Sequence, residues 1–264
     1  MKVAVISNLE TQQGRSSFIT LLSSVFSRSQ HKRVTILSTG SMKHFLDAVE
    51  IKANMTAIKS VSVLKVVMSA SNVQEEEMND YAIRVGSEEV YAYDIFSSTL
   101  AKDDLQSLFM SILKQAKSEL VLVEVVGSPD EPFNKQVLEN VDAIINVFNH
   151  NPASIEAVRD YVDNGDRDIV RRTGFVCQKY DANAISEAKL GKFINMNARN
   201  FIVIPYNSVV QKESLNGTLN TLAKFIVKGN SEVINLRSKF LEVMQFLFDS
   251  PRYKYIKGVN EWHK

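Results

Sequence analysis

Short apolar runs alternate with longer amphipathic segments along the chain, and this alternation constrains the fold more than any other feature of the sequence. The runs LVLVEVV at 120–126 and FIVIP at 201–205 are almost continuously apolar. A strand that is apolar on both faces needs helices on both sides of its sheet. The repeated order of strand and helix therefore predicts an α/β fold with a doubly wound, mostly parallel sheet and helices on both faces.

The pattern also locates the expected elements. Strands are predicted at 3–7, 33–37, 89–95, 120–126, 143–148, 174–178 and 201–204. Helices are predicted at 18–26, 55–68, 100–116, 152–162, 219–227 and 231–248. The acidic segment 74–80 is predicted to be a solvated loop. We expect a main domain at 1–229, followed at 230–264 by an amphipathic helix and a basic, aromatic tail.

Composition limits the classes of partner and compartment. The 31 Lys and Arg residues balance 30 Asp and Glu residues, so no global field favours nucleic acid, and nucleic acid is not an expected partner. The single cysteine, Cys177, excludes an intramolecular disulfide and is expected to pack in a strand. No stretch reaches the ~20 apolar residues of a membrane span, and the N-terminus enters a strand directly. We expect a cytoplasmic protein, at most peripheral to the inner face of the membrane.

The turn after the first strand has the outline of a phosphate-binding loop. The first βα turn of such a fold is a favoured anion site, and a P-loop reads G-x-x-x-x-G-K-[ST]. Here Gly14 and Ser16 fit that pattern, Arg15 replaces the lysine, and Leu9 replaces the first glycine. We expect Gly14, Arg15, Ser16 and Ser17 to bind phosphate; from these residues alone, a polar turn whose serines begin a helix is the alternative.

Histidines and serines give no competing catalytic pattern. The four histidines and Cys177 lack metal-ligand spacing, so a zinc site is not expected. His150 follows a predicted strand and is expected to be a solvated loop residue, with a place in a cleft as the alternative. No G-x-S-x-G nucleophile elbow accompanies the serines.

Five segments, in order, resemble the MinD/ParA family of deviant-Walker P-loop ATPases (SIMIBI class) along nearly the whole chain. The family loop K-G-G-x-G-K-[ST]-[ST] corresponds to ETQQGRSS at 10–17, and the family D-x-D to STG at 38–40. The switch-II Asp and Pro correspond to Glu124 and Pro129. NPASI at 151–155 resembles the family P-x-S-[IL], and IPYNSVVQKESLNG at 204–217 resembles its closing strand, loop and helix. Within the family, the chain most resembles the TadZ/CpaE-like positioning proteins, although we expect no receiver-like domain before Met1.

This resemblance implies a P-loop NTPase fold, ATP or ADP with Mg²⁺ as ligand, and a homodimer that switches its affinity for protein partners or a membrane. Ser16 and Glu124 take the positions of the magnesium ligands. Gln178 takes the place of the family's base-binding Asn, and Tyr206 and Asn207 are further base-contact candidates. For these last three residues, polar loop positions at strand ends are the alternative.

Several positions depart from the family chemistry. Glu10 replaces the lysine that reaches across the dimer and would bring a carboxylate towards a polyanion. Arg15 is longer and planar where the family has a compact ammonium. Ser38 removes an acidic group, and Glu124 adds a methylene beside the metal position. We therefore expect a pseudo-ATPase that acts as a scaffold or positioning protein for a larger assembly, such as secretion, pilus, conjugation or partition machinery; the alternative is a weak ATPase whose partner supplies missing groups.

The amphipathic segment 231–248 has two interpretations. We expect first a final helix packed on the sheet. The alternatives are a dimer interface, a partner-binding helix, or a weak membrane contact as in MinD-like proteins. The tail beyond Pro251 interleaves Lys and Arg with Tyr and Trp and is expected to be solvated, with contact to phosphates or lipid headgroups as the alternative.

Overall fold

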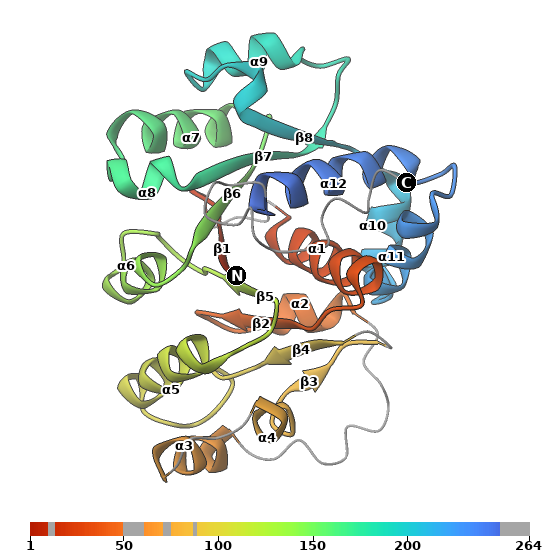
Figure 1. Ribbon diagram of the computed structural model, residues 1–264. Coiled ribbons are helices and arrows are strands. Elements are labelled where there is room, and N and C mark those ends of the chain that lie inside the picture. Colours follow the sequence, from red (N-terminus) through yellow and green to blue (C-terminus); the bar gives the residue numbers. More distant parts are fainter. Residues whose placement is uncertain (10–13, 50–60, 71–74, 87–88, 249–264) are drawn as a thin grey trace.

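A computed structural model describes residues 1–264 except 10–13, 50–60, 71–74, 87–88 and 249–264. Its described residues form an eight-stranded sheet with the order β3-β4-β2-β5-β1-β6-β7-β8 (Figure 1). The strands are β1 (Lys2–Ile6), β2 (Val34–Ser38), β3 (Ile83–Arg84), β4 (Val90–Tyr93), β5 (Leu120–Glu124), β6 (Ala143–Asn149), β7 (Thr173–Tyr180) and β8 (Phe201–Pro205). All neighbouring pairs are parallel except β3 with β4, which confirms the predicted fold class.

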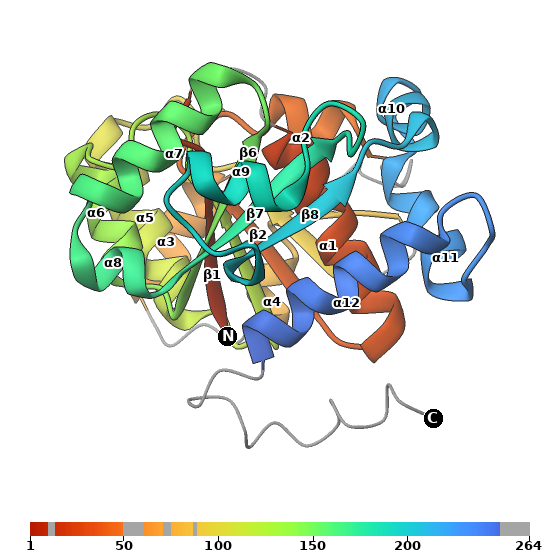
Figure 2. The ribbon, with the colours of Figure 1, turned by 90° about the horizontal axis from the view of Figure 1, so that it is seen from above.

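Helices cover both faces of the sheet, as its apolar strands require (Figures 1 and 2). On one face lie α1 (Arg15–Gln30), α2 (Lys43–Asp47), α10 (Ser208–Leu215), α11 (Leu219–Lys228) and α12 (Ile234–Phe248). On the other lie α3 (Val61–Ala70), α4 (Glu75–Asn79), α5 (Lys102–Gln115), α6 (Pro132–Glu139), α7 (Pro152–Asn164), α8 (Arg167–Arg171) and α9 (Glu187–Phe193), with the short 3₁₀ helix η1 (Ala198–Asn200) before β8. Every residue of β2 and β5 is consequently buried.

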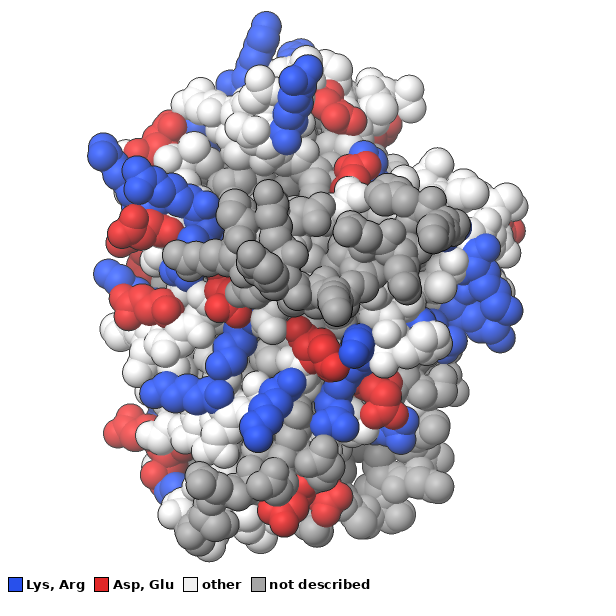
Figure 3. All heavy atoms as spheres, in the orientation of Figure 1, with Lys and Arg blue, Asp and Glu red and all other residues white. Residues whose placement is uncertain are grey.

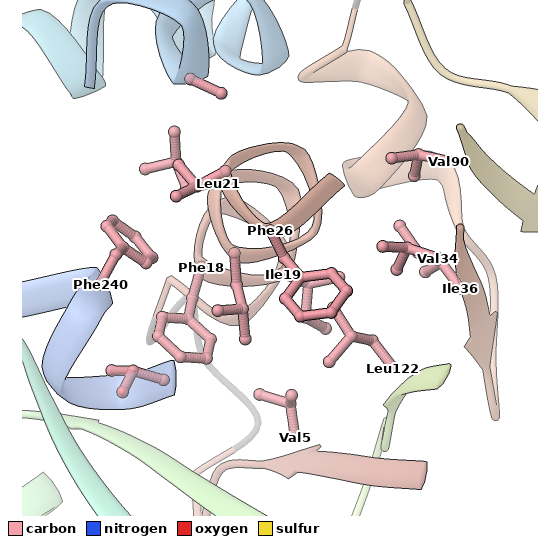
Figure 4. Close-up of a cluster of buried hydrophobic side chains, with 14 of the residues drawn as sticks. Val5, Phe18, Ile19, Leu21, Phe26, Val34, Ile36, Val90, Leu122 and Phe240 are labelled. Carbon is pink, nitrogen blue, oxygen red and sulfur yellow. The ribbon is translucent and has the colours of Figure 1, made fainter. Parts of the chain in front are cut away.

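The core beneath α1 joins the first helix to the last one (Figure 4). Phe18 and Ile19 of α1 are almost fully buried against Val5 and Leu122 of the sheet. Phe18 stacks on Phe240 of α12 with a centroid distance of 6.0 Å. The C-terminal helix therefore packs on the sheet and α1, as expected first, and most of its apolar side chains are buried. The tail beyond it lies outside the described residues.

The structure corrects three local predictions. The acidic segment 74–80 is not wholly a loop, because Glu75–Asn79 forms α4, which Met78 anchors with 1% of its surface exposed. The antiparallel strand β3 was not predicted, since two residues carry no periodicity. His150 is half-buried, and its ring packs edge-on against Tyr180 at 6.1 Å. The first part of the predicted helix 55–68 lies outside the described residues.

Strand β7 contains an irregularity next to its carboxyl end. Lys179 has φ 52°, a left-handed conformation that is uncommon for a residue with a side chain. The register with β8 shifts between Cys177 and Tyr180, as a β-bulge does. Cys177 and Tyr180 consequently face the same core cluster although they are three positions apart.

The described surface carries mixed charge. On the face seen in Figure 3, Lys and Arg side chains alternate with Asp and Glu. In the described part of the chain, no helix combines the length and the apolar character that crossing a membrane requires. Cys177 is fully buried in β7, as predicted, and burial raises the pKa of its thiol to about 12.

Candidate functional site

The first turn of α1 presents backbone donors at the carboxyl edge of the sheet. Gly14 precedes the helix in a left-handed conformation, with φ 82°, and no side chain caps the helix. The first intrahelical bond runs from Phe18 N–H to the Gly14 carbonyl at 2.8 Å. Within the described chain, the backbone N–H groups of 15–17 have no acceptor. Such a helix start attracts anions, because the free N–H groups and the helix dipole both favour negative charge.

Gln178 places its side chain directly against this turn. A Cβ atom added to Gly14 would overlap the Oε1 atom of Gln178. The positive φ of Gly14 favours glycine at this position, and a larger residue would also displace the end of the Gln178 side chain. The contact brings two predicted site residues together from β7 and the first loop.

Arg15 turns towards the sheet. Its Nη1 atom donates to the carbonyl oxygen of Val125, just after β5, at 2.5 Å. Burial lowers the pKa of the Arg15 guanidinium, and the Glu124 carboxylate opposes that shift. The guanidinium remains protonated near neutrality because its ordinary pKa exceeds 12. The cation at the P-loop lysine position is therefore present, but it is bonded to the protein's own backbone.

Ser16 and Glu124 form the second link between α1 and β5. The Ser16 hydroxyl donates to Oε1 of Glu124 at 2.7 Å, and only 5% of Glu124 is exposed. Burial raises the pKa of Glu124, while Ser16, Arg15 and His44 each act to lower it. A hydroxyl and a carboxylate oxygen are the kind of donors that Mg²⁺ accepts, so this pair fits the metal position that the resemblance implied.

The end of β2 offers no acidic group. Ser38 is the register partner of Glu124 and is 1% exposed. Its Oγ accepts the Gly40 N–H at 3.3 Å. Thr39 ties β2 to β5 through its N–H, which donates to the Glu124 carbonyl at 2.9 Å. The Ser38 hydroxyl thus stabilises the local turn, and this position has no carboxylate that could accept a proton.

Hydrogen bonds from three side chains hold the turn that follows β5. Arg15 holds the carbonyl of Val125, and the Thr39 hydroxyl accepts the N–H of Val126 at 2.9 Å. Asn134, which is 2% exposed, donates to the carbonyls of Val126 and Ser128, both at 2.8 Å. A conformational change in this turn would have to break these hydrogen bonds.

Asn149, at the end of β6, is a candidate that sequence reasoning missed. It is the register partner of Gln178, and its Oδ1 is buried without a hydrogen-bond partner in the described part of the structure. Its place in the alternation after Ile145 and Val147 could have identified it. The neighbouring His150 points to the opposite face, towards Tyr180.

The remaining predicted residues are less directly placed. Tyr206 is 54% exposed, and its hydroxyl donates to Gln211 at 2.6 Å. Asn207 caps α10 by accepting from Val209 N–H, while its amide donates to the Glu232 carbonyl. Ser17 lies half-buried in the first turn of α1. Glu10 falls outside the described residues, so its predicted position stays a prediction.

Sequence comparison with protein-family models and with curated proteins gives no match. Comparison with solved structures does give matches. A ParA family ATPase from Chlorobium tepidum TLS superimposes with a TM-score of 0.68 at 11% identity, over 92% of this chain and 97% of that one. MinD from Pyrococcus horikoshii OT3, complexed with Mg-ADP, gives 0.62 at 15% identity, over 92% and 95%. This chain has the MinD/ParA fold.

The MinD/ParA fold explains why the candidate residues meet. Its parallel strands end at one edge, where β1, β5, β6 and β7 lie side by side. Ligands of open α/β sheets bind at this edge. The structure thus brings together Gly14, Arg15, Ser16, Glu124 and Gln178, which the sequence places more than 160 positions apart at the extremes.

Replacing Glu124 by glutamine should change how stability depends on pH. The pKa of Glu124 is higher in the folded protein than in the unfolded chain, so the folded protein binds the proton of this carboxyl group more tightly. The stability that this proton contributes is fully present below the pKa of Glu124 in the unfolded chain. It is lost as the pH rises through the pKa of Glu124 in the folded protein. Glu124→Gln cannot titrate, so its melting temperature should rise relative to that of wild type as the pH increases above the ordinary pKa of a glutamate, about 4.3.

Thermal unfolding at several pH values checks this result, with Glu139→Gln, an exposed glutamate of α6, as the matched control. The control should follow wild type across the range. A constant difference between Glu124→Gln and wild type at every pH would contradict the assignment.

Proposed function

We propose that this protein is a MinD/ParA-like pseudo-ATPase, which binds nucleotide phosphate at Gly14–Ser17 with little or no hydrolysis and acts as a scaffold. The observation that carries the proposal is the pair of bonds from α1 to β5. Arg15 bonds to the Val125 carbonyl and Ser16 bonds to Glu124. The side chains that would serve phosphate and metal thus also hold the loop in a fixed arrangement.

Phosphate binding is supported by the helix start itself. The N–H groups of 15–17 lack acceptors in the described structure, Gly14 has the conformation that leaves them open, and Arg15 supplies a cation. When Mg²⁺ accompanies the nucleotide, Ser16 and Glu124 are the residues that would hold it. The metal would neutralise phosphate charge beside the buried carboxylate.

Weak turnover is supported by the missing acidic group and by the fixed turn. Ser38 provides a hydroxyl that cannot accept a proton at neutral pH. The turn at 125–128 is held by Arg15, Thr39 and Asn134. Hydrolysis that depends on rearranging this turn would have to break those bonds, whereas a scaffold needs only the fixed surface.

The assembly that such a scaffold serves follows only from fold analogy. One similar structure is the MinC:MinD cell division protein complex of Aquifex aeolicus, and another is pNOB8 ParA bound to nonspecific DNA. For this chain we propose protein partners of a secretion, pilus, conjugation or partition assembly, with TadZ/CpaE-like positioning proteins as the nearest branch. A homodimer, a cytoplasmic location and weak membrane contact belong to the same proposal; the near-neutral charge makes nucleic acid the less suitable partner.

ATP with Mg²⁺ should raise the melting temperature of the wild-type protein, since a ligand that binds the native state stabilises it. Arg15→Ala should remove most of this increase because it removes the cation at the helix start. Arg159→Ala, an exposed arginine of α7, is the control and should respond as wild type does. Phosphate release should stay at background for all three proteins. ATP hydrolysis that Arg15→Ala abolishes would overturn the pseudo-ATPase proposal.

A weak ATPase is the second candidate, and the Ser16–Glu124 pair favours it because the metal position keeps a hydroxyl and a carboxylate at 2.7 Å. A partner could then supply the missing groups in trans, as arginine fingers do. This candidate predicts that cell extract containing the partner stimulates phosphate release by wild type but not by Arg15→Ala. A wild-type protein that ATP and Mg²⁺ fail to stabilise would exclude it.

A further inference from the structure

We propose that Asn149 is a specificity-determining residue that accepts a hydrogen bond from the exocyclic amino group of an adenine base. The inference rests on the proposed function, since it concerns a nucleotide whose phosphates bind at Gly14–Ser17. It adds a second amide to Gln178, which the resemblance alone had placed near a base.

Asn149 and Gln178 lie side by side on the α1 face of the sheet. They are register partners in the parallel pair β6–β7. Two positions earlier on each strand, Val147 and Val176 belong to the core cluster beneath α1. Because side chains alternate along a strand, Asn149 and Gln178 point to that same face. Gln178 also abuts Gly14, so the amide pair lies beside the candidate phosphate site.

The Asn149 side chain has an acceptor that the described protein leaves unsatisfied. The Oδ1 atom of Asn149 is buried and accepts no hydrogen bond there, while its backbone N–H donates to the Ser154 hydroxyl at 3.1 Å. The Gln178 side chain is 8% exposed and has no hydrogen bond to a described residue. Folded proteins leave few buried polar atoms unpaired, and a ligand is one reason for an exception. A ligand that donates a proton to Asn149 Oδ1 would satisfy it.

The unsatisfied acceptor selects among nucleobases. The N6 amino group of adenine is a donor beside the N7 acceptor, and a carboxamide matches that pair. Guanine presents two acceptors, O6 and N7, at the same edge, so it leaves Asn149 Oδ1 without a donor in that orientation. The amide pair therefore favours adenine nucleotides over guanine nucleotides.

Calorimetric titration with ATP, GTP and tripolyphosphate tests the assignment. Wild type should bind ATP more tightly than GTP. Asn149→Ala should lose about tenfold in ATP affinity, a typical effect of one good base contact, and should keep its affinity for tripolyphosphate. Its melting temperature without ligand should not fall, because the variant removes a buried acceptor that the protein leaves unpaired.

Two further variants make the result specific. Asn149→Asp keeps an acceptor oxygen in nearly the same shape, so it should keep the preference for ATP over GTP. Asn183→Ala replaces an exposed asparagine outside β6 and β7 and should match wild type with all three ligands.

The outcomes separate this inference from the proposed function. A wild-type protein that binds none of the three ligands overturns the proposed function. If wild type binds ATP and tripolyphosphate and Asn149→Ala binds ATP as tightly as wild type does, only the role of Asn149 is overturned. Equal affinities of wild type for ATP and GTP, or an equal loss of ATP and tripolyphosphate binding in Asn149→Ala, also overturn it.

Discussion

Replacing Phe240 by alanine should lower the free energy of unfolding by about 3–5 kcal/mol, the range for removing a buried aromatic side chain. Phe240 is 1% exposed and stacks on Phe18 with an interplanar angle of 24°. The cavity left behind would lie between α1 and α12, where both helices contact the sheet (Figure 4). Denaturant unfolding followed by circular dichroism measures the loss.

Phe246 provides the matched control on the same helix. It is 41% exposed, so Phe246→Ala should cost only about 1 kcal/mol, since full burial of such a side chain contributes about 1.5–3 kcal/mol. A membrane-binding or detachable C-terminal helix predicts instead that both variants unfold like wild type. Equal small losses would therefore show that α12 is not part of the core.

Replacing Gly14 by alanine should both destabilise the protein and remove nucleotide binding. A left-handed conformation costs an L-residue about 1–2 kcal/mol, and the new Cβ would overlap Gln178 Oε1. Either the Gln178 side chain swings away or the turn relaxes towards a negative φ, and in the second case the N–H groups of 15–17 move with it. Loss of the ATP-induced increase in melting temperature is the expected result.

Gly229→Ala separates the two effects. Gly229 has φ 72° at the end of α11, so the alanine there meets a similar backbone penalty. It lies outside the carboxyl edge and should leave ATP binding unchanged. Retention of the full ATP response by Gly14→Ala would contradict the placement of phosphate at this turn.

The fold was predictable where burial imposes a strong pattern. Strands such as β5 are apolar on both faces, so their number and order along the chain could be inferred. Helix α4 was missed because Met78 is a single buried apolar residue in an acidic segment, which gives no apolar periodicity. Strand β3 was missed because two residues that pair with β4 across the chain show no local signal.

The site was predictable by position but not by contact. The P-loop pattern placed Gly14 and Ser16 at one edge of the sheet, and the family resemblance placed Glu124 beside them. It could not show that Arg15 bonds to the Val125 carbonyl, because that contact depends on the side chain's path across 110 positions of sequence. The alternation after Ile145 and Val147 placed Asn149 on one face of the sheet, but only the structure shows that Gln178 is its register partner.

The bulge at Lys179 decides which face of the sheet the end of β7 presents. The extra residue reverses the alternation of β7, which keeps the Tyr180 ring beside His150. A regular strand over the same residues would turn the tyrosine ring to the α1 face, on the side of Gln178 and Asn149. Such a strand would keep the fold but place an aromatic ring next to these two amides, so the bulge is as much a determinant of the site as the identity of any residue in it.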